Sequence, residues 1–323
     1  MNNSTENYYT DTSRISNSNI GWFIKYGPAY LHKMLTTHPE EQSTAAMRKG
    51  TMIHMYLLQP EEFVNTYEQK DFVEPKSVQQ KKFCESLINT LEIEPNKALL
   101  SAYKDSYSTV GQSEDLMLSK AKEMASTFKS YIEYNKNPNS KIKISRYDVA
   151  MLENIRDKVQ EHKLAKELIN PKEGETHHEF HINWEYCDVQ CKSLLDSVNF
   201  NFEAKICTLV DLKTTVHIGC FEESMQEYDY LRQLCFYQEA LKWYITNELH
   251  QDPMDWMFDV YIVAIDTVND NEIRVFRFYP SQIKSRLQTI ENVLKEIKWH
   301  QDTDKWEHHK QYYDGDGSET LSL

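Results

Sequence analysis

The sequence predicts an α/β protein in which one mixed β-sheet is flanked by helices and preceded by a mainly helical half. Three observations lead to this prediction. Apolar residues recur at helical spacing through much of the chain before Ile169. The pattern becomes strand-like after Asn170-Pro171. The later segments then follow the order three strands, helix, two strands, helix, which is typical of one sheet covered by helices.

In the first half, Ser16 is placed to cap a short helix that ends near Gly27-Pro28. A second helix is expected from about Ser43 to Leu58, where Pro60 stops it. Helical spacing then recurs over residues 78–91, 112–134 and 145–168. We expect residues 1–13 to be disordered, residues 14–175 to form the helical part, residues 176–303 to form the sheet-containing core, and residues 304–323 to form a polar tail.

The second half is predicted from segments that are rich in β-branched and aromatic residues. Residues 178–186, 190–200 and 204–215 are separated by short polar turns, which predicts a β-meander. A helix follows from about Asp229 to Leu249, then strands over 256–266 and 272–279. An amphipathic helix over 280–300 closes the order.

Composition excludes several classes of protein. With 40% hydrophobic and 27% charged residues, the chain resembles globular proteins rather than disordered or fibrous ones. It contains no apolar run of membrane-spanning length and no signal-like start, so we expect a cytoplasmic protein with no membrane partner. The net charge of -14 counts against non-specific coating of nucleic acid, but it permits a groove with local positive charge.

The six cysteines are scattered along the chain, so we expect reduced thiols rather than a disulfide framework. Cys187 and Cys191 lie near three histidines and could supply zinc ligands. Two cysteines without a second paired motif do not decide whether zinc binds.

Asp211 and Lys213 stand two positions apart on the third expected strand, so their side chains share one face of the sheet. Charged groups beside an apolar core are costly unless they are paired. Asp196 lies in the preceding strand, and a hairpin through residues 199–205 would bring it beside Asp211. Two converging carboxylates repel unless a cation lies between them, and oxygen ligands suit Mg²⁺ or Mn²⁺.

Such an ion can activate a phosphodiester, while Lys213 orients the attacking water or stabilises the transition-state charge. The alternative is an ordinary Asp211–Lys213 ion pair with Asp196 as a turn residue. These three positions alone do not decide between the two interpretations.

Several segments together resemble a known family. The run from Asp196 to VDLKTT resembles the PD-(D/E)XK nuclease motif, and Gln233 with Tyr237 resembles the Gln-xxx-Tyr motif of its RecB-type branch. AAMRKGTMIHMYLLQPEEF resembles the segment of RecE-like exonucleases in which a histidine follows a Gly-Thr step. The start of that domain is also resembled by the segment SRISNSNIGWFIKYGPAYL. From about residue 14 to 300, these segments follow one another in the same order as in the family.

The resemblance implies a role for each matching residue. His54, Asp196 and Asp211 would hold the metal and Lys213 would be the catalytic lysine. Gln233 and Tyr237 match residues that approach the DNA backbone or support the site. Glu179 falls where the family often carries a further acid, which would be another metal ligand. The sequence departs from the family where KSLLD replaces a Pro-Asp step and where the second acid is Asp rather than Glu.

Taken alone, the accessory residues are ordinary. A histidine in the setting of His54 is more often a core or surface residue, and Gln233 and Tyr237 are common helix residues. The aromatic residues around the expected long helix are typical of cores and surfaces rather than of a base-stacking platform; they are Tyr228, Tyr230, Phe236 and Trp243.

The resemblance implies a 5′ to 3′ exonuclease that acts on linear double-stranded DNA ends, uses Mg²⁺ or Mn²⁺, and leaves 3′ single strands for recombination. It further implies a phage or prophage setting, a single-strand annealing protein as partner, and a homo-oligomer. Two alternatives stay open: an endonuclease or defence-related nuclease of the same fold, and a non-catalytic DNA-binding or inhibitory protein. The last predicts loss of Asp211 or Lys213, and both are present.

Overall fold

The computed structural model describes residues 5–37, 43–70, 72–91, 94–136 and 141–318. The chain divides into two compact units. Met1–Pro60 and Met151–Leu323 form the first, and Glu61–Ala150 is inserted between them as the second. The boundary expected at 175/176 marks the start of the sheet, whereas the compact units divide after Pro60 and after Ala150. Every predicted site residue belongs to the first unit.

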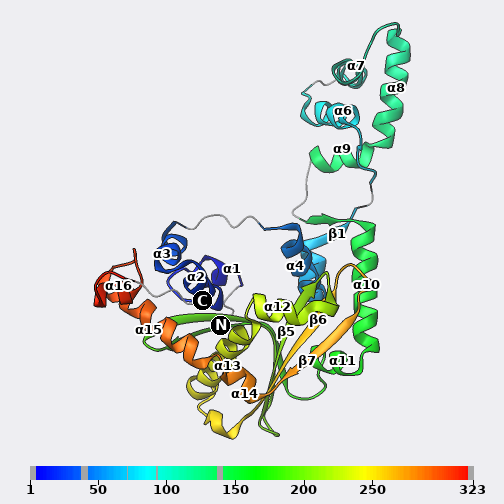
Figure 1. Cartoon of the computed structure of the whole chain (residues 1–323). Coiled ribbons are helices and arrows are strands. Elements are labelled where there is room, and N and C mark those ends of the chain that lie inside the picture. The colour runs from blue at the N-terminus through cyan, green and yellow to red at the C-terminus, as the bar shows by residue number, and fades with distance from the viewer. Residues whose placement is uncertain (1–4, 38–42, 71, 92–93, 137–140, 319–323) are drawn as a thin grey trace. The chain divides into compact units, whose positions relative to one another are not determined.

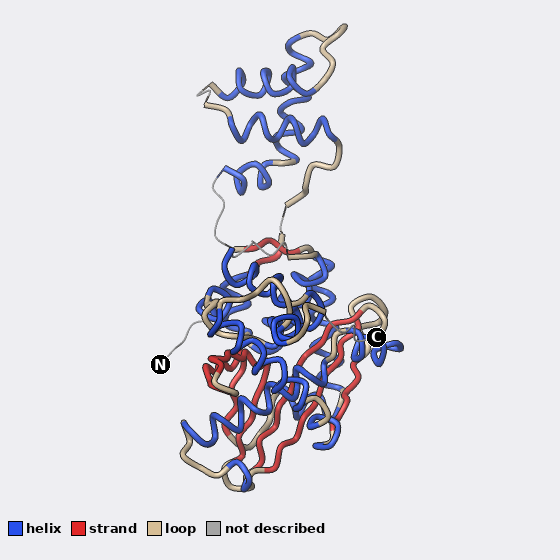
Figure 2. The backbone as a smooth tube through the Cα atoms, turned by 60° about the vertical axis from the view of Figure 1, so that its left-hand side comes forward, coloured by secondary structure: helices blue, strands red, loops and turns tan. Residues whose placement is uncertain are grey.

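The first unit is built on a five-stranded sheet in the order β3-β4-β5-β6-β7. Figure 2 draws the strands in red. β3 (Glu175–Tyr186), β4 (Val189–Asn201) and β5 (Ile206–Thr215) form the expected antiparallel meander. β6 (Met257–Asp266) lies parallel to β5, and β7 (Ile273–Phe278) lies antiparallel to β6. The predicted mixed sheet is therefore confirmed.

Helices cover both faces of this sheet. α13 (Tyr230–Asn247) and α15 (Leu287–Thr303) lie on one face, and α11 (Lys163–Ile169) lies on the other against β7 (Figure 1). Trp184 of β3 and Phe236 of α13 are almost fully buried where sheet and helix meet, with ring centroids 4.8 Å apart. Burial of such large apolar side chains dominates the stability of a core.

The first unit contains further helices, which pack on the sheet or on one another. They are α1 (Thr5–Thr10), α2 (Asn17–Tyr26), α3 (Pro28–Thr37), α4 (Ala45–Leu58), α10 (Arg146–Glu161), which begins in the second unit, α12 (Phe221–Glu227), α14 (Pro280–Lys284), α16 (Lys310–Asp314) and the 3₁₀ turns Ile218–Cys220 and Pro253–Asp255. Ser16 caps α2 as predicted, and α4 ends before Pro60 as predicted. Among the described residues, no helix combines the length and the apolar character needed to cross a membrane.

The second unit is a small helical body with a core of its own, which includes Phe83 and Met117. Its elements are α5 (Pro60–Thr66), β1 (Tyr67–Gln69), α6 (Val78–Asn89), α7 (Pro95–Ser106), α8 (Glu114–Thr127), α9 (Lys129–Lys136) and β2 (Ile142–Ile144), with β1 parallel to β2. The sequence did not predict α7. Two of its three buried residues are alanines, so its apolar stripe is weak.

Helices lie within both segments that the sequence analysis set apart at the chain ends. The segment predicted to be disordered contains α1, in which the ring of Tyr8 packs edge-on against His181 at 5.4 Å. The predicted polar tail contains the buried Trp306 and α16. Single aromatic residues in otherwise polar stretches anchor both segments, and composition averaged over a stretch does not register them. Residues 1–4 and 319–323 lie outside the described residues.

Glu296 on α15 holds the C-terminal segment of the first unit in place, and its contribution to the free energy of unfolding depends on pH. Its Oε1 accepts a hydrogen bond from the backbone N–H of Lys310 and lies 2.9 Å from Nδ1 of His309. Burial would raise the pKa of Glu296, but its contacts with His300, Lys310 and His309 outweigh burial and lower the pKa to about 2. Because the folded pKa is depressed, the stabilisation is complete above the unfolded value of about 4.3 and is lost as pH falls through about 2.

We expect Glu296→Gln to lower the free energy of unfolding at neutral pH by about 1–3 kcal/mol, because the charge-assisted hydrogen bonds weaken. The difference from the parent should shrink as pH falls from about 4 toward 2, where the parent also loses the charge. Urea unfolding at neutral and acidic pH measures both effects. Equal stability of the two proteins at every pH would show that this carboxylate does not anchor the chain end.

Candidate active site

The candidate active site lies where two neighbouring strands separate. β4 and β5 are paired from Asn201 with Ile206 as far as Ser197 with Val210, and the pairing ends there. The next positions in the same register are Asp196 and Asp211. β5 stays paired with β6 along its whole length, so the sheet opens between β4 and β5 at the two aspartates. The sequence therefore places two carboxylates side by side at a fork.

Where the backbone pairing of β4 with β5 ends, a side-chain hydrogen bond joins the two strands. The backbone N–H of Leu212 donates to Oδ2 of Asp196 at 2.7 Å, although Leu212 belongs to β5 and Asp196 to β4. This bond satisfies a backbone group that the separated strands would leave unpaired. It also fixes the direction in which the Asp196 carboxylate points.

Asp211 is held by two neighbours and is only 1% exposed. Nζ of Lys213 lies 2.5 Å from its Oδ2, and Nε2 of Gln233 donates to its Oδ1 at 3.0 Å. Gln233 also donates to the hydroxyl of Tyr237, one turn further along α13. Asp211 and Lys213 thus meet on one face as predicted, and Gln233 and Tyr237 face Asp211 as supports.

α4 brings His54 to the fork. Nδ1 of His54 lies 3.7 Å from Oδ2 of Asp196. One turn earlier in the helix, Gly50 allows the close approach to β5, because a Cβ at this position would lie 3.1 Å from Oγ1 of Thr214. The Gly-Thr step before the histidine therefore has a structural reason.

Glu179 also lies at the fork, at a position of β3 where the regular pairing with β4 is interrupted. The pairs His178 with Ser197 and Phe180 with Leu195 put Glu179 opposite Asp196, although these two residues do not themselves pair. The φ angle of Glu179 is 48°, in the left-handed region that side chains with a Cβ rarely adopt. Backbone strain of this kind concentrates at functional sites.

His54, Glu179 and Asp196 each offer a ligand atom within 4.8 Å of the others. One imidazole and two carboxylates are a donor set that suits a divalent cation. Asp211 is not a member of this three-residue group, and its oxygens contact Lys213 and Gln233 instead. The structure thus brings all the predicted acids to one fork but gives them different neighbours.

Burial governs the pKa values of the acids at this site. Burial and the charge of Asp196 raise the pKa of Glu179 to about 8. Burial raises the pKa of Asp211 to about 6 although Lys213 opposes it, and burial also raises the pKa of Asp196. Burial lowers the pKa of His54 to about 4, which keeps the imidazole in the neutral form that binds metals. A divalent cation fits this set because it would offset the crowded carboxylates.

Lys213 behaves differently from most buried lysines. Burial alone would lower its pKa, but the charges of Asp211 and Asp196 outweigh burial and raise the pKa. The ammonium also lies 5.0 Å from the centre of the Tyr230 ring, within range of a cation–π interaction. Lys213 is therefore a permanent cation at neutral pH and a donor of hydrogen bonds rather than a base.

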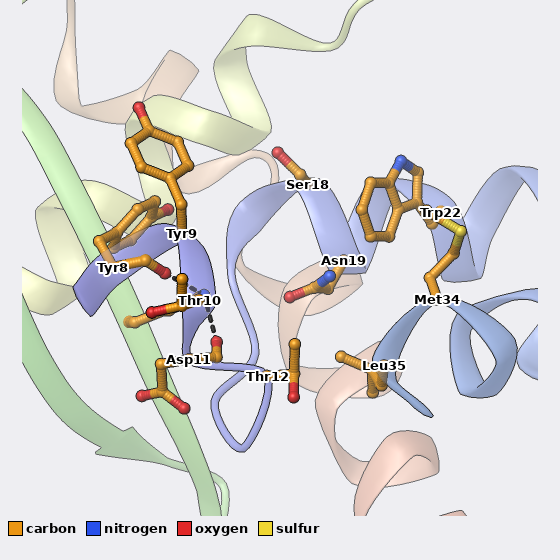
Figure 3. A pocket seen from close by; sticks show the side chains of 11 residues that line it. Tyr8, Tyr9, Thr10, Asp11, Thr12, Ser18, Asn19, Trp22, Met34 and Leu35 are labelled. Atoms are coloured by element: carbon orange, nitrogen blue, oxygen red, sulfur yellow. Dashed lines mark hydrogen bonds between the residues drawn. The ribbon is translucent and has the colours of Figure 1, made fainter. Parts of the chain in front are cut away.

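Another cavity of the described chain lies away from the fork. It measures about 570 Å³, with Tyr8 and Tyr9 on one side and Trp22 and Met34 on the other (Figure 3). The ammonium of Lys192 at this cavity is bonded to the backbone carbonyls of Tyr8 and Asp11. None of the predicted site residues lines it, so the site is identified by its chemistry and not by cavity size.

Comparison with known proteins agrees with this geometry. A family described as "PDDEXK-like domain of unknown function (DUF3799)" matches residues 16–311. The chain belongs to this family. No significant match was found among curated proteins. The crystal structure of a protein named "Putative exonuclease", from Eubacterium rectale, shares 12% sequence identity with a TM-score of 0.52, and the match covers 100% of this chain and 96% of that one.

Membership of the PDDEXK-like family confirms the superfamily and the fold that the sequence predicted. The sequence resemblance assigned the two acids and the lysine of the motif to Asp196, Asp211 and Lys213, and these three residues lie at the fork. Sequence reasoning missed two features of this PDDEXK-like site: the bond from Leu212 N–H and the ring of Tyr230 over Lys213. Neither has a sequence signal, because a backbone donor and a distant aromatic ring are brought there only by the fold.

The cysteines take no part in this site. All six are free thiols. Within the described ranges, the group of residues placed to hold a metal contains no cysteine. Cys191 is buried in the core of the first unit, and its thiol contacts the carbonyl of Val189 at 3.5 Å. Its position gives no support to a zinc site with Cys187.

The contact of Gln233 with Asp211 predicts an effect on turnover. Gln233→Leu keeps the size of the side chain but removes the donor to Oδ1 of Asp211, so the carboxylate loses one of its supports. We expect kcat for DNA hydrolysis to fall by about 10-fold with little change in KM. Steady-state kinetics measure the split, and Tyr237→Phe, which removes only the outer hydroxyl, should have a smaller effect. A rise in KM alone would assign Gln233 to DNA contact instead.

Proposed function

We propose that this protein is a divalent-metal-dependent deoxyribonuclease that hydrolyses phosphodiester bonds. The observation that carries the proposal is the fork between β4 and β5, which gathers Asp196, Asp211, Lys213 and His54 around one point. An ion pair that served only stability would need neither the second aspartate nor the neutral imidazole. Membership of the PDDEXK-like family supports the same conclusion.

Three residues, His54, Glu179 and Asp196, would hold the ion, with Asp211 directly beside them. A bound Mg²⁺ or Mn²⁺ supplies Lewis acidity toward the phosphodiester. In the reaction a water oxygen forms a bond to phosphorus, the bond from phosphorus to the leaving oxygen breaks, and the proton of the water is released while the leaving oxygen gains one.

The protein groups contribute position and charge. The ammonium of Lys213 stabilises the negative charge that develops on the phosphate oxygens, or orients the attacking water. Gln233 and Leu212 N–H fix Asp211 and Asp196 before substrate arrives, so little reorganisation is needed during the reaction. Tyr237 in turn holds Gln233.

We further propose a 5′ to 3′ exonuclease on linear double-stranded DNA that produces 3′ single strands for recombination, in a phage or prophage setting. The support is the RecE-like segment around His54 and the Gln233–Tyr237 pair of the RecB-type branch. The Eubacterium rectale protein of similar fold is also named an exonuclease. The same resemblance suggests Mg²⁺ as the ion, a single-strand annealing protein as partner and a homo-oligomer, whose size light scattering would measure.

The deciding experiment digests linear duplex DNA labelled at the 5′ or the 3′ end, with a covalently closed circle in parallel, in Mg²⁺, in Mn²⁺ and with a chelator. We expect early release of the 5′ label, an intact circle and no cleavage with chelator. Cleavage of the circle would assign an endonuclease of the same fold. Undiminished DNA binding with no cleavage under any metal would leave only the non-catalytic alternative.

A further inference from the structure

A second cavity, of about 430 Å³, lies next to Lys213, because Thr214 and Thr215, the following residues of β5, line it. It is formed by the first turn of α4, the end of β5, α12 and the residues after β6; they are Ala45, Ala46, Lys49, Thr214, Thr215, Val216, Phe221, Ser224, Tyr228, Tyr230, Thr267 and Val268. We propose that this cavity binds the base of the nucleotide next to the bond that is cut, stacked on Tyr228. This inference rests on the proposed nuclease function and names a contact that positions its substrate.

The cavity adjoins the active site. Thr214 and Thr215 follow Lys213 directly on β5, and both line the cavity. The ring of Tyr230 lines it too, and the same ring lies 5.0 Å from Nζ of Lys213. A phosphate held by Lys213 would therefore have its neighbouring sugar and base at the mouth of this cavity.

The cavity presents an aromatic face that its own core rings support. Phe276 stacks on Phe221 with ring centroids 5.1 Å apart, and Tyr230 stacks on Tyr228 at 5.7 Å with 21° between the ring planes. Phe221 and Tyr230 join these two pairs through a tilted contact at 6.0 Å. The first rings are buried or half-buried, whereas Tyr228 is 57% exposed. The ring of Tyr228 is thus supported on one side by Tyr230, and its exposed π-face is available for stacking with a base.

The charge of the cavity suits a nucleotide. Among the described residues that line it, none is Asp or Glu, although the chain carries a net charge of -14. Lys49 supplies positive charge, with its ammonium bonded to the carbonyl of Thr267 at 2.8 Å, and the hydroxyls of Thr214 and Ser224 supply polar contacts. The cavity at the N-terminal segment, in contrast, contains Asp11. An anionic strand is therefore better accommodated beside Lys213.

The kinetic test compares Tyr228→Ala and Tyr228→Phe with a control, Tyr26→Ala. The exposed fraction of Tyr26, 52%, is similar to that of Tyr228, and Tyr26 lines none of the described cavities. We expect Tyr228→Ala to raise KM for linear duplex about 5- to 100-fold, because stacking of a base on an aromatic ring is lost. Tyr228→Phe keeps the ring and should stay near the parent value, as should Tyr26→Ala. Equal losses in Tyr228→Ala and Tyr26→Ala would reflect general destabilisation and overturn the inference.

A direct test uses duplex DNA that carries 5-iododeoxyuridine at successive nucleotides from each end, irradiated with the parent protein in Ca²⁺ to suppress cleavage. We expect a crosslink at Tyr228 that Tyr228→Ala abolishes and Tyr26→Ala preserves. If the protein cleaves DNA but the crosslinks lie elsewhere, this inference fails and the nuclease proposal stands. If the parent neither cleaves nor crosslinks DNA, both fail together.

Discussion

Replacement of Asp211 by Asn is expected to reduce DNA cleavage by about 10³-fold or more and to leave DNA binding within a few-fold of the parent. The amide keeps the shape of the side chain and its oxygen can still accept from Gln233. It removes the negative charge beside the His54, Glu179 and Asp196 group and ends the ion pair with Lys213. Because these effects act on charge rather than shape, the loss should lie in kcat.

Single-turnover cleavage in Mg²⁺ and fluorescence anisotropy in Ca²⁺ measure the two quantities separately. Asp259→Asn is the matched control, since Asp259 lies on β6 of the same sheet and forms a surface ion pair with Arg277 at 2.6 Å. It should cleave like the parent, because surface ion pairs contribute about 1 kcal/mol or less. Parental activity of Asp211→Asn with linear duplex would end the catalytic hypothesis.

The sheet was predictable from sequence because its strands carry unambiguous local signals. The meander of β3, β4 and β5 follows from three β-branched and aromatic segments joined by short turns, and the predicted ranges agree with the structure within a few residues. Strands with one buried face leave little freedom of register. The order of the later elements then determined the mixed sheet.

The elements that escaped prediction lack such signals. α12 is a short helix with two acids in its first turn and a single buried residue, Phe221. The separation of Glu61–Ala150 as a compact unit depends on which helices pack together, and helical periodicity alone does not reveal this. Local patterns identify elements, whereas the division into units is a property of tertiary contacts.

The candidate site was predictable in part for the same reason. The hairpin places Asp196 opposite Asp211, and the period of two puts Lys213 on the same face. The opening of the strands and the left-handed conformation of Glu179 depend on packing across the whole sheet. Sequence reasoning therefore predicted that these acids lie together, but it did not distinguish Asp211, which contacts Lys213 and Gln233, from the group of His54, Glu179 and Asp196.

Replacement of Lys213 by Met should reduce kcat by about 10²- to 10³-fold, because the site loses a fixed donor toward the developing phosphate charge. The side chain is only 17% exposed and its pKa is raised by Asp211 and Asp196, so in the parent the charge is always present. Lys213→Arg keeps a charge, but the planar guanidinium cannot reproduce the compact ammonium at 2.5 Å from Asp211. We expect it to recover only a minor part of the activity.

A second measurement separates the role of Lys213 from that of a metal ligand. The ammonium repels a divalent ion held by His54, Glu179 and Asp196, so Lys213→Met should bind Mn²⁺ at least as tightly as the parent by calorimetry. Lys192→Met is the matched control, since Lys192 is a buried lysine on β4 whose ammonium contacts only backbone carbonyls and the ring of Tyr8 among the described residues. It should retain cleavage. If Lys213→Met lost Mn²⁺ binding together with activity, the lysine would be needed to build the site, and its proposed action on the phosphate would have to be withdrawn.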